Sequence, residues 1–238
     1  MTIFGRLLLG TALGAVGLGL IWGAKAWGQD TPATTSTNPP AVFVLIENGG
    51  TVQARDEMSE NINFLLGELT QLRRRRATRD TQVHIVLSAD PTQVAWSGTP
   101  EQLFLQGHEV LDVIAFRDTC SDLVLAWDQI EITARITMPS AIELIQVGPM
   151  IHAGFPCDGD DTVIKLPQPV PTDLALADMA NEARRLLFIG VHADQDEVYL
   201  DHLRDTGALA RARSGEVVFD LLDMARARAV RGAFLEDK

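Results

Sequence analysis

The sequence predicts an α/β fold, a three-layer sandwich in which a mostly parallel central sheet with an antiparallel edge hairpin lies between two layers of helices. Two observations lead to this expectation. Short apolar runs rich in β-branched residues alternate with amphipathic stretches, which is typical of buried parallel strands separated by helices. A turn-forming segment joins two strand-like runs with no helix between them, which indicates a hairpin.

The expected core strands are short apolar runs. Residues 41–46 are continuously apolar and β-rich, as expected for a strand that is buried on both faces of a parallel sheet. The other core strands are residues 83–88, 141–147 and 186–191. Residues 93–97 are expected to run back along 83–88 after a turn at 89–92. Residues 216–219 are expected to form either a strand or the start of a helix.

The expected helices are amphipathic segments between these strands. Residues 59–72 place apolar side chains three and four positions apart, which predicts a helix with one buried face. Thr99 is expected to cap another helix, with Pro100 as its first residue. Further helical segments are expected at residues 120–127, 172–185, 196–205 and 221–233.

Charge excludes some classes of partner. The chain carries 32 acidic and 20 basic side chains, for a formal net charge of −12, which argues against binding to nucleic acid or to anionic lipid. One basic block stands out, Arg73 to Arg76 with Arg79. It has two interpretations, an anion or partner site and the end of a helix, where cations complement the carboxyl-end dipole. We favour the helix end.

The N-terminal residues indicate export. Residues 1–28 have a short basic start, an uncharged apolar run at 7–24 and a small-x-small cleavage pattern, so they are expected to be a signal peptide or a signal anchor. Residues 29–40 are rich in threonine and proline and are expected to be a flexible linker. Residues 41–238 then form one domain. The domain is expected outside the cytoplasm, either periplasmic or secreted, with residues 7–24 as its membrane contact and inner-membrane anchor if they are retained.

The two cysteines of the chain, Cys120 and Cys157, are expected to form a disulfide, since an exported chain meets an oxidising compartment. A redox role requires closely spaced cysteines near a helix start, and the chain has no CxxC motif. The disulfide is therefore expected to be structural.

The order of elements resembles the von Willebrand factor A-like family, whose sheet is Rossmann-like. The resemblance covers nearly all of residues 41–238 as a pattern of elements with few identities. It rests on residues 42–51, the helix from Ser59, the hairpin of 83–88 and 94–97, and the segments 187–192 and 198–203. It implies a domain that binds other proteins, often through a metal ion held on loops at the carboxyl ends of the strands.

The metal-binding pattern of that family is degenerate here. Its first loop has an Asp-x-Ser-x-Ser pattern, and this chain keeps only a carboxylate at Glu47 and a hydroxyl at Thr51. Thr119 falls where the family has a second-loop threonine, and residues 148–150 replace the aspartate expected after the third core strand. Losing a carboxylate and a hydroxyl removes much of the oxygen array that a hard cation needs. No cofactor is expected, and a divalent cation on Glu47, Thr51 and Thr119 is the alternative.

Independently of the family, open α/β sheets place ligands at the carboxyl ends of their parallel strands. The candidate binding residues are therefore Glu47, Asn48, Gly49, Gly50, Thr51, Thr119, His152, His192 and Asp194. His192 and Asp194 also begin the densest group of metal-ligand side chains, with Asp196, Glu197, Asp201 and His202. Helix capping, with acids in the first turn, is the interpretation that we favour for this group.

No nucleophile signature is present, neither a Gly-x-Ser-x-Gly elbow nor a Ser-x-x-Lys motif nor a phosphate loop. The balance therefore favours a protein that is not an enzyme. The sequence predicts an exported protein-binding module, a component of a bacterial-type cell-envelope assembly, with a protein partner and no nucleic acid. The alternatives are an extracytoplasmic hydrolase or metal-dependent enzyme that uses the strand-end loops, and a purely structural membrane-held subunit.

Overall fold

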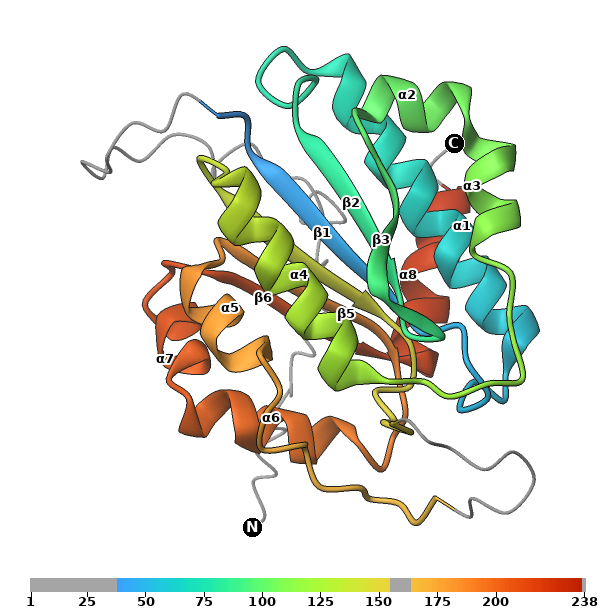
Figure 1. Ribbon diagram of the computed structural model, residues 1–238, viewed down its shortest axis with the longest axis vertical. Coiled ribbons are helices and arrows are strands. Elements are labelled where there is room, and N and C mark those ends of the chain that lie inside the picture. The colour runs from blue at the N-terminus through green and yellow to red at the C-terminus, as the bar shows by residue number, and fades with distance from the viewer. Residues whose placement is uncertain (1–37, 155–163, 237–238) are drawn as a thin grey trace, which may run out of the picture.

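A six-stranded sheet with helices on both sides forms the body of the protein, and the predicted fold class is confirmed (Figure 1). The computed structural model describes residues 38–154 and 164–236. The strand order is β3-β2-β1-β4-β5-β6. The strands are β1 (Ala41–Ile46), β2 (Gln82–Leu87), β3 (Asp90–Gly98), β4 (Ile142–Val147), β5 (Arg185–Val191) and β6 (Val218–Asp223).

All neighbouring strands run parallel except β2 and β3, which form the predicted antiparallel hairpin at one edge. Strand β1 lies near the middle and pairs over its whole length with β2 and with β4. All six of its residues are buried, as the continuous apolar run predicts. The hairpin turn is tighter than expected, because Asp90 already belongs to β3.

The helices form the two outer layers (Figure 1). They are α1 (Arg55–Gln71), the 3-10 turn η2 (Leu72–Arg74), α2 (Pro100–Leu105), α3 (Gly107–Val113), α4 (Leu123–Thr137), α5 (Leu176–Glu182), α6 (Asp196–Asp205), α7 (Ala208–Arg213) and α8 (Met224–Glu236). Helices α4 to α7 cover one face of the sheet, and α1 to α3 with α8 cover the other.

Two apolar cores result from the alternation of side chains along β1. Phe43 and Leu45 point into the first core, where Trp127 of α4 is completely buried. Val44 and Ile46 point into the second core, where they meet the apolar face of α1. The chain therefore needs a helical layer on each face, which is why the sandwich has three layers.

The helix expected at residues 120–127 is α4, and its observed bounds differ from the expected ones. It begins at Leu123, because the side chain of Asp122 accepts a hydrogen bond from the backbone N–H of Leu125 at 3.0 Å. It then continues to Thr137, since Ile130 and Ala134 are buried in the first core. The β-branched residues of its second half have low helix propensity, and tertiary burial outweighs that preference.

The last strand and the short helices also differ from expectation. Strand β6 is longer than residues 216–219 and pairs with β5 at the sheet edge, so α8 begins at Met224 rather than at residue 221. Helix α5 is shorter than residues 172–185, because Arg185 already belongs to β5. The helical segment expected from Pro100 is divided into α2 and α3, and α7 has no counterpart among the expected elements.

The expected start of α2 and the expected carboxyl end of α1 are confirmed. Thr99 forms a capping box with Gln102, and Pro100 is the first residue of α2. Helix α1 is longer than expected at its start but ends at Gln71, and the arginine run begins in the 3-10 turn that closes it.

The predicted signal segment, residues 1–28, lies outside the described residues. Within the residues that are described, no helix combines the length and apolarity needed to cross a bilayer. The end of the predicted linker is attached to the domain, because the Asn38 side chain donates to the backbone carbonyls of Thr137 and Met138 at 3.0 and 3.1 Å. The chain therefore enters the fold beside the carboxyl end of α4.

Cys120 is buried and disulfide-bonded. Its expected partner, Cys157, lies outside the described residues. The pairing of these two cysteines thus stays a prediction.

Candidate functional site

The candidate site is the set of loops at the carboxyl ends of the parallel strands, which we call the strand-end face. It consists of residues 47–54 after β1, 118–121 before α4, 148–154 after β4 and 192–195 after β5. Because β1, β4 and β5 are parallel, their loops come together at one edge of the sheet.

Glu47 stands at the centre of this face and is completely buried. Its Oε1 accepts hydrogen bonds from Gln146 Nε2 and from the backbone N–H of Met150, both at 2.8 Å. Its Oε2 accepts from the backbone N–H of Ile151 at 3.3 Å. The carboxylate therefore holds the loop after β4 against the end of β1.

Burial raises the pKa of Glu47 to about 7, although its three hydrogen bonds pull the pKa down. A carboxyl group with such a pKa at a strand end is often a catalytic acid or base. Here both oxygens face protein donors and no part of the residue reaches solvent. The geometry thus gives Glu47 a structural role.

The loop after β4 has a special shape that brings its amides onto Glu47. Met150 has a φ of 60°, in the left-handed region that non-glycine residues seldom adopt. Gly148 approaches Glu47 so closely that a Cβ atom there would lie 2.4 Å from the Glu47 Cβ. A glycine at position 148 is therefore required by the position of Glu47.

Asn48 ties the β1 loop to its neighbours. Its Oδ1 accepts from the backbone N–H of Ala89 and its Nδ2 donates to the carbonyl of Ala115, both at 3.1 Å. Its backbone N–H donates to Ser88 Oγ at 3.2 Å, and Ser121 Oγ donates to the same hydroxyl at 2.7 Å. Three loops are thus joined through buried polar groups.

Gly49 and Gly50 lie against the segment before α4. The Gly50 N–H donates to the carbonyl of Thr119 at 2.7 Å, and a Cβ on Gly49 would lie 2.4 Å from the carbonyl oxygen of Cys120. Gly49 is buried, whereas Gly50 and the Thr119 side chain are exposed. Gly50 and Thr119 therefore lie side by side at the surface where these two loops meet.

His152 is half-buried and caps α4 from outside that helix. Its Nδ1 accepts a hydrogen bond from the backbone N–H of Leu123 at 3.1 Å. Its backbone N–H and carbonyl are bonded to the side chain of Gln168 at 2.8 and 2.7 Å. Gln195 continues this network, since its Nε2 donates to the carbonyl of Met150 at 3.1 Å.

His192 and Asp194 lie in the loop after β5. The His192 Nδ1 accepts from the backbone N–H of Asp194 at 3.2 Å, which is a local turn. Asp196 and Glu197 occupy the first turn of α6, as expected, but the N-cap is Gln195, whose side chain makes no capping hydrogen bond. Asp201 pairs with Arg204 further along the helix. Among the described residues, no three or more His, Cys, Asp or Glu side chains come together in a group that could hold a metal ion.

The three candidate metal ligands differ in their burial and in their hydrogen bonds. Glu47 accepts N–H donors with both oxygens, Thr51 is buried, and the side chain of Thr119 is exposed. A cation at Glu47 would have to displace those N–H groups, which point their positive ends at the same oxygens. The arrangement in this structure does not fit a metal site at Glu47.

Several residues of the network were missed by sequence reasoning, namely Ser88, Ser121, Gln146, Gln168 and Gln195. Gln146 carried a usable signal, because a single amide inside an apolar strand must find buried partners. It bonds Glu47 on one side and accepts from Trp127 Nε1 at 3.2 Å on the other. The remaining four gave no signal, because polar residues in loops are common.

No sequence family and no curated protein matches the chain. Among solved structures, it is similar to the PilB minor pilin from Streptococcus sanguinis, with 9% identity and a TM-score of 0.49 over 86% of this chain and 61% of that chain. A point mutant of the same pilin gives 10% identity and a TM-score of 0.44, over 87% and 62%. The chain thus spans less than two thirds of those pilin chains, and the likeness concerns the arrangement of the chain only.

Proposed function

We propose that this protein is an exported protein-binding module, a component of a cell-envelope assembly, whose partner contacts the strand-end face. The observation that supports this most is the use of the polar side chains there. Glu47 and Asn48 hold the loops together from inside, and the groups that face outward around Gly50 and Thr119 include the Gln53 side chain and the Arg55–Asp118 ion pair. A rigid surface built from several loops suits recognition of another protein.

We also propose that the domain is von Willebrand factor A-like and that it binds without a bridging cation. The sheet order and the antiparallel hairpin at the β3 edge support the family proposal. The three N–H groups on Glu47 support the second part, since they occupy the place that a cation would take. Contact with the partner then depends on shape and on apolar burial.

The proposal is tested by Thr119→Arg. This exposed side chain stands beside Gly50 and takes no part in the buried network, so a bulky cation there should weaken partner binding about tenfold or more and leave the melting temperature nearly unchanged. The measurement is affinity capture of a partner from detergent-solubilised envelopes, followed by a binding titration with the captured protein. Asn63→Arg, on the exposed side of α1, is the matched control.

Chelation gives a second arm of the same experiment. Binding through shape alone should be unchanged in chelator. A partner that Thr119→Arg still captures, and that chelator releases, would contradict the proposal and would point to metal-dependent binding elsewhere on the domain.

A further inference from the structure

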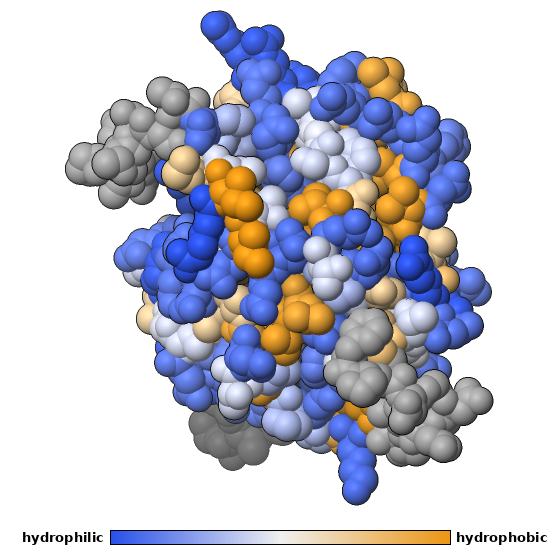
Figure 2. Space-filling view, in the orientation of Figure 1, coloured by the Kyte–Doolittle hydropathy of each residue, from blue (hydrophilic) through white to orange (hydrophobic). Residues whose placement is uncertain are grey.

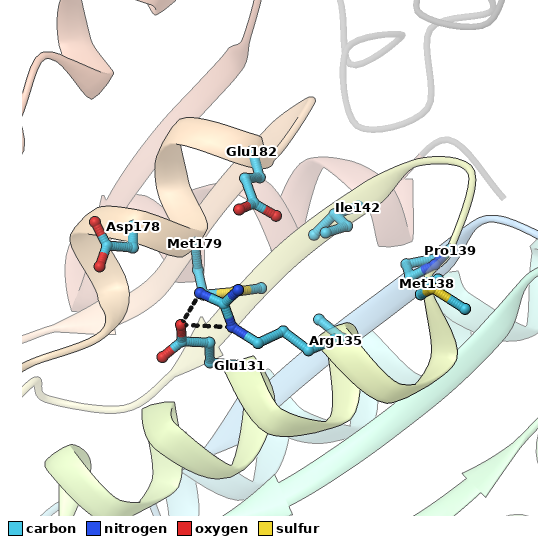
Figure 3. A pocket seen from close by; sticks show the side chains of 9 residues that line it. Glu131, Arg135, Met138, Pro139, Ile142, Asp178, Met179 and Glu182 are labelled. Atoms are coloured by element: carbon cyan, nitrogen blue, oxygen red, sulfur yellow. Dashed lines mark hydrogen bonds and ion pairs between the residues drawn. The ribbon is translucent and has the colours of Figure 1, made fainter. Parts of the chain in front are cut away.

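A hollow of 190 Å³ lies between α4 and α5, at the amino end of β4 and therefore at the opposite end of the sheet from the strand-end face (Figure 3). Its apolar lining consists of Ala134, Met138, Pro139, Ile142 and Met179. Its charged lining consists of Glu131 and Arg135 from α4 with Asp178 and Glu182 from α5. We call these nine residues the acidic hollow.

The hollow carries excess negative charge, because three carboxylates face one guanidinium. Arg135 is bonded to Glu131, and Figure 3 shows it reaching from α4 towards α5. The bond to Glu131 and the fields of Glu131, Glu182 and Asp178 raise the pKa of Arg135. Asp178 and Glu182 are exposed and form no ion pair within the described part of the chain. They are available to cations of another molecule.

Apolar side chains continue this surface along α4. Ile132, Ile136 and Met138 are 50%, 73% and 64% exposed. Figure 2 shows a band of hydrophobic residues over α4, bordered by hydrophilic ones. Exposed apolar area of this kind next to unpaired carboxylates suits a partner surface that is both apolar and basic.

The same chain carries such a surface in its other helical layer. Arg74 and Arg76 follow α1, are exposed, and form no ion pair within residues 38–154 and 164–236. Helix α2 lies beside them and exposes Phe104 and Leu105 by 51% and 72%. Arg73 joins the two, because its guanidinium lies 3.8 Å from the centre of the Phe104 ring. We call Arg73, Arg74, Arg76, Phe104 and Leu105 the basic patch.

We propose that the basic patch of one copy of this protein binds the acidic hollow of a second copy. Arginines of the patch then pair with Asp178 and Glu182, while Phe104 and Leu105 cover the apolar residues of α4. The two surfaces carry opposite charges, and each has an apolar component that can pack against the other. The arginine run thus serves both as a helix end and as a contact surface.

The placement of the two surfaces determines the kind of assembly. The hollow belongs to the α4–α7 layer and the patch to the α1–α3 layer, so one molecule can use both at the same time. A contact between two different surfaces is heterologous, and it extends into a ring or a filament rather than stopping at a dimer. The net charge of −12 opposes association in general, so attraction has to come from these two surfaces.

Sedimentation of the full chain in mild detergent tests the proposal by charge reversal. Variant A carries Asp178→Lys and Glu182→Lys, so both of its surfaces are basic. Variant B carries Arg74→Glu and Arg76→Glu, so both of its surfaces are acidic. We expect the wild type to associate with increasing concentration, and each variant alone to lose about tenfold or more in association constant.

An equimolar mixture of the two variants should recover association, because every contact in it again joins a basic to an acidic surface. Asp56→Lys with Glu197→Lys is the control, since it changes the net charge as variant A does but on exposed residues in the first turns of α1 and α6, at the other end of the sheet from both surfaces. A wild type that stays monomeric would overturn the proposal. Association that variants A and B leave unchanged, or failure of the mixture to recover it, would overturn it as well. Capture of a partner through Thr119 uses the other end of the sheet and should be the same in variants A and B.

Discussion

Replacing Gly148 with alanine is expected to lower the free energy of unfolding by about 4 kcal/mol. The added Cβ would lie within 2.4 to 2.5 Å of the Cβ, Cγ and Cδ of Glu47, which is completely buried. Glu47 would have to leave its place, and Gln146, Met150 and Ile151 would each keep a buried donor without an acceptor. Urea unfolding with linear extrapolation measures the change.

Gly67→Ala is the matched control for that variant. Gly67 lies on the exposed side of α1, and a Cβ there would meet nothing within 4 Å. Alanine is the better helix former, so this change should stabilise the protein by up to about 1 kcal/mol. A loss of less than about 1 kcal/mol in Gly148→Ala would show that the loop after β4 can move away from Glu47 at little cost.

Glu47→Gln is expected to remove a pH dependence of stability worth about 3 kcal/mol. The pKa of Glu47 rises from 4.5 to about 7 on folding, mainly because the carboxyl group is buried. The folded state therefore holds a proton that the unfolded state releases. The contribution of Glu47 to the free energy of unfolding is fully present below pH 4.5, decreases as the pH rises from there, and is lost once the pH has passed through 7.

The measurement is a series of urea unfolding curves from pH 5 to pH 8 on both proteins. Glutamine keeps an oxygen that can accept from Gln146 and Met150 but does not titrate. The difference between the two proteins isolates Glu47 from other groups whose pKa is shifted, such as Glu143 and His84. Parallel curves for the two proteins would show that Glu47 has the same pKa in both states.

The sheet was the most predictable part of the fold. A strand buried on both faces has no position for an exposed side chain, so its sequence must be apolar throughout, as in residues 41–46. The cap at Thr99 was equally predictable, because its hydrogen bonds reach only to Gln102. Local rules suffice wherever the interacting groups are neighbours in sequence.

Helix α4 shows where local rules fail. Residues 130–137 combine isoleucines and threonines, which favour strands, yet they form the second half of a helix. Ile130 and Ala134 are buried against the sheet, while Ile132 and Ile136 face solvent. The sequence does not tell these isoleucines apart, because their burial depends on the position of β1 and β3.

The loops predicted to form the candidate site lie together at one edge of the sheet, but the bonding of Glu47 within them was not predictable. A carboxylate after the first strand suggests a ligand site, whatever surrounds it. Here Glu47 is bonded to Gln146 and Met150, which lie 99 and 103 residues away in the chain. Only the pairing of β1 with β4 brings these donors to the carboxylate, so only the tertiary structure decides that Glu47 is a buried structural group.

By itself, the sequence determined the three-layer α/β architecture, the edge hairpin, the carboxyl end of α1 and the start of α2, because burial periodicity and capping act over a few residues. The tertiary structure decided which polar residues are buried, as with Glu47 and Asn48, and which apolar residues remain exposed, as with Ile136. It also decided that α4 and α5 meet in an acidic hollow while the arginines lie in the other helical layer. These features depend on contacts between segments far apart in the chain, and such contacts exist only once the sheet has set the positions of the helices.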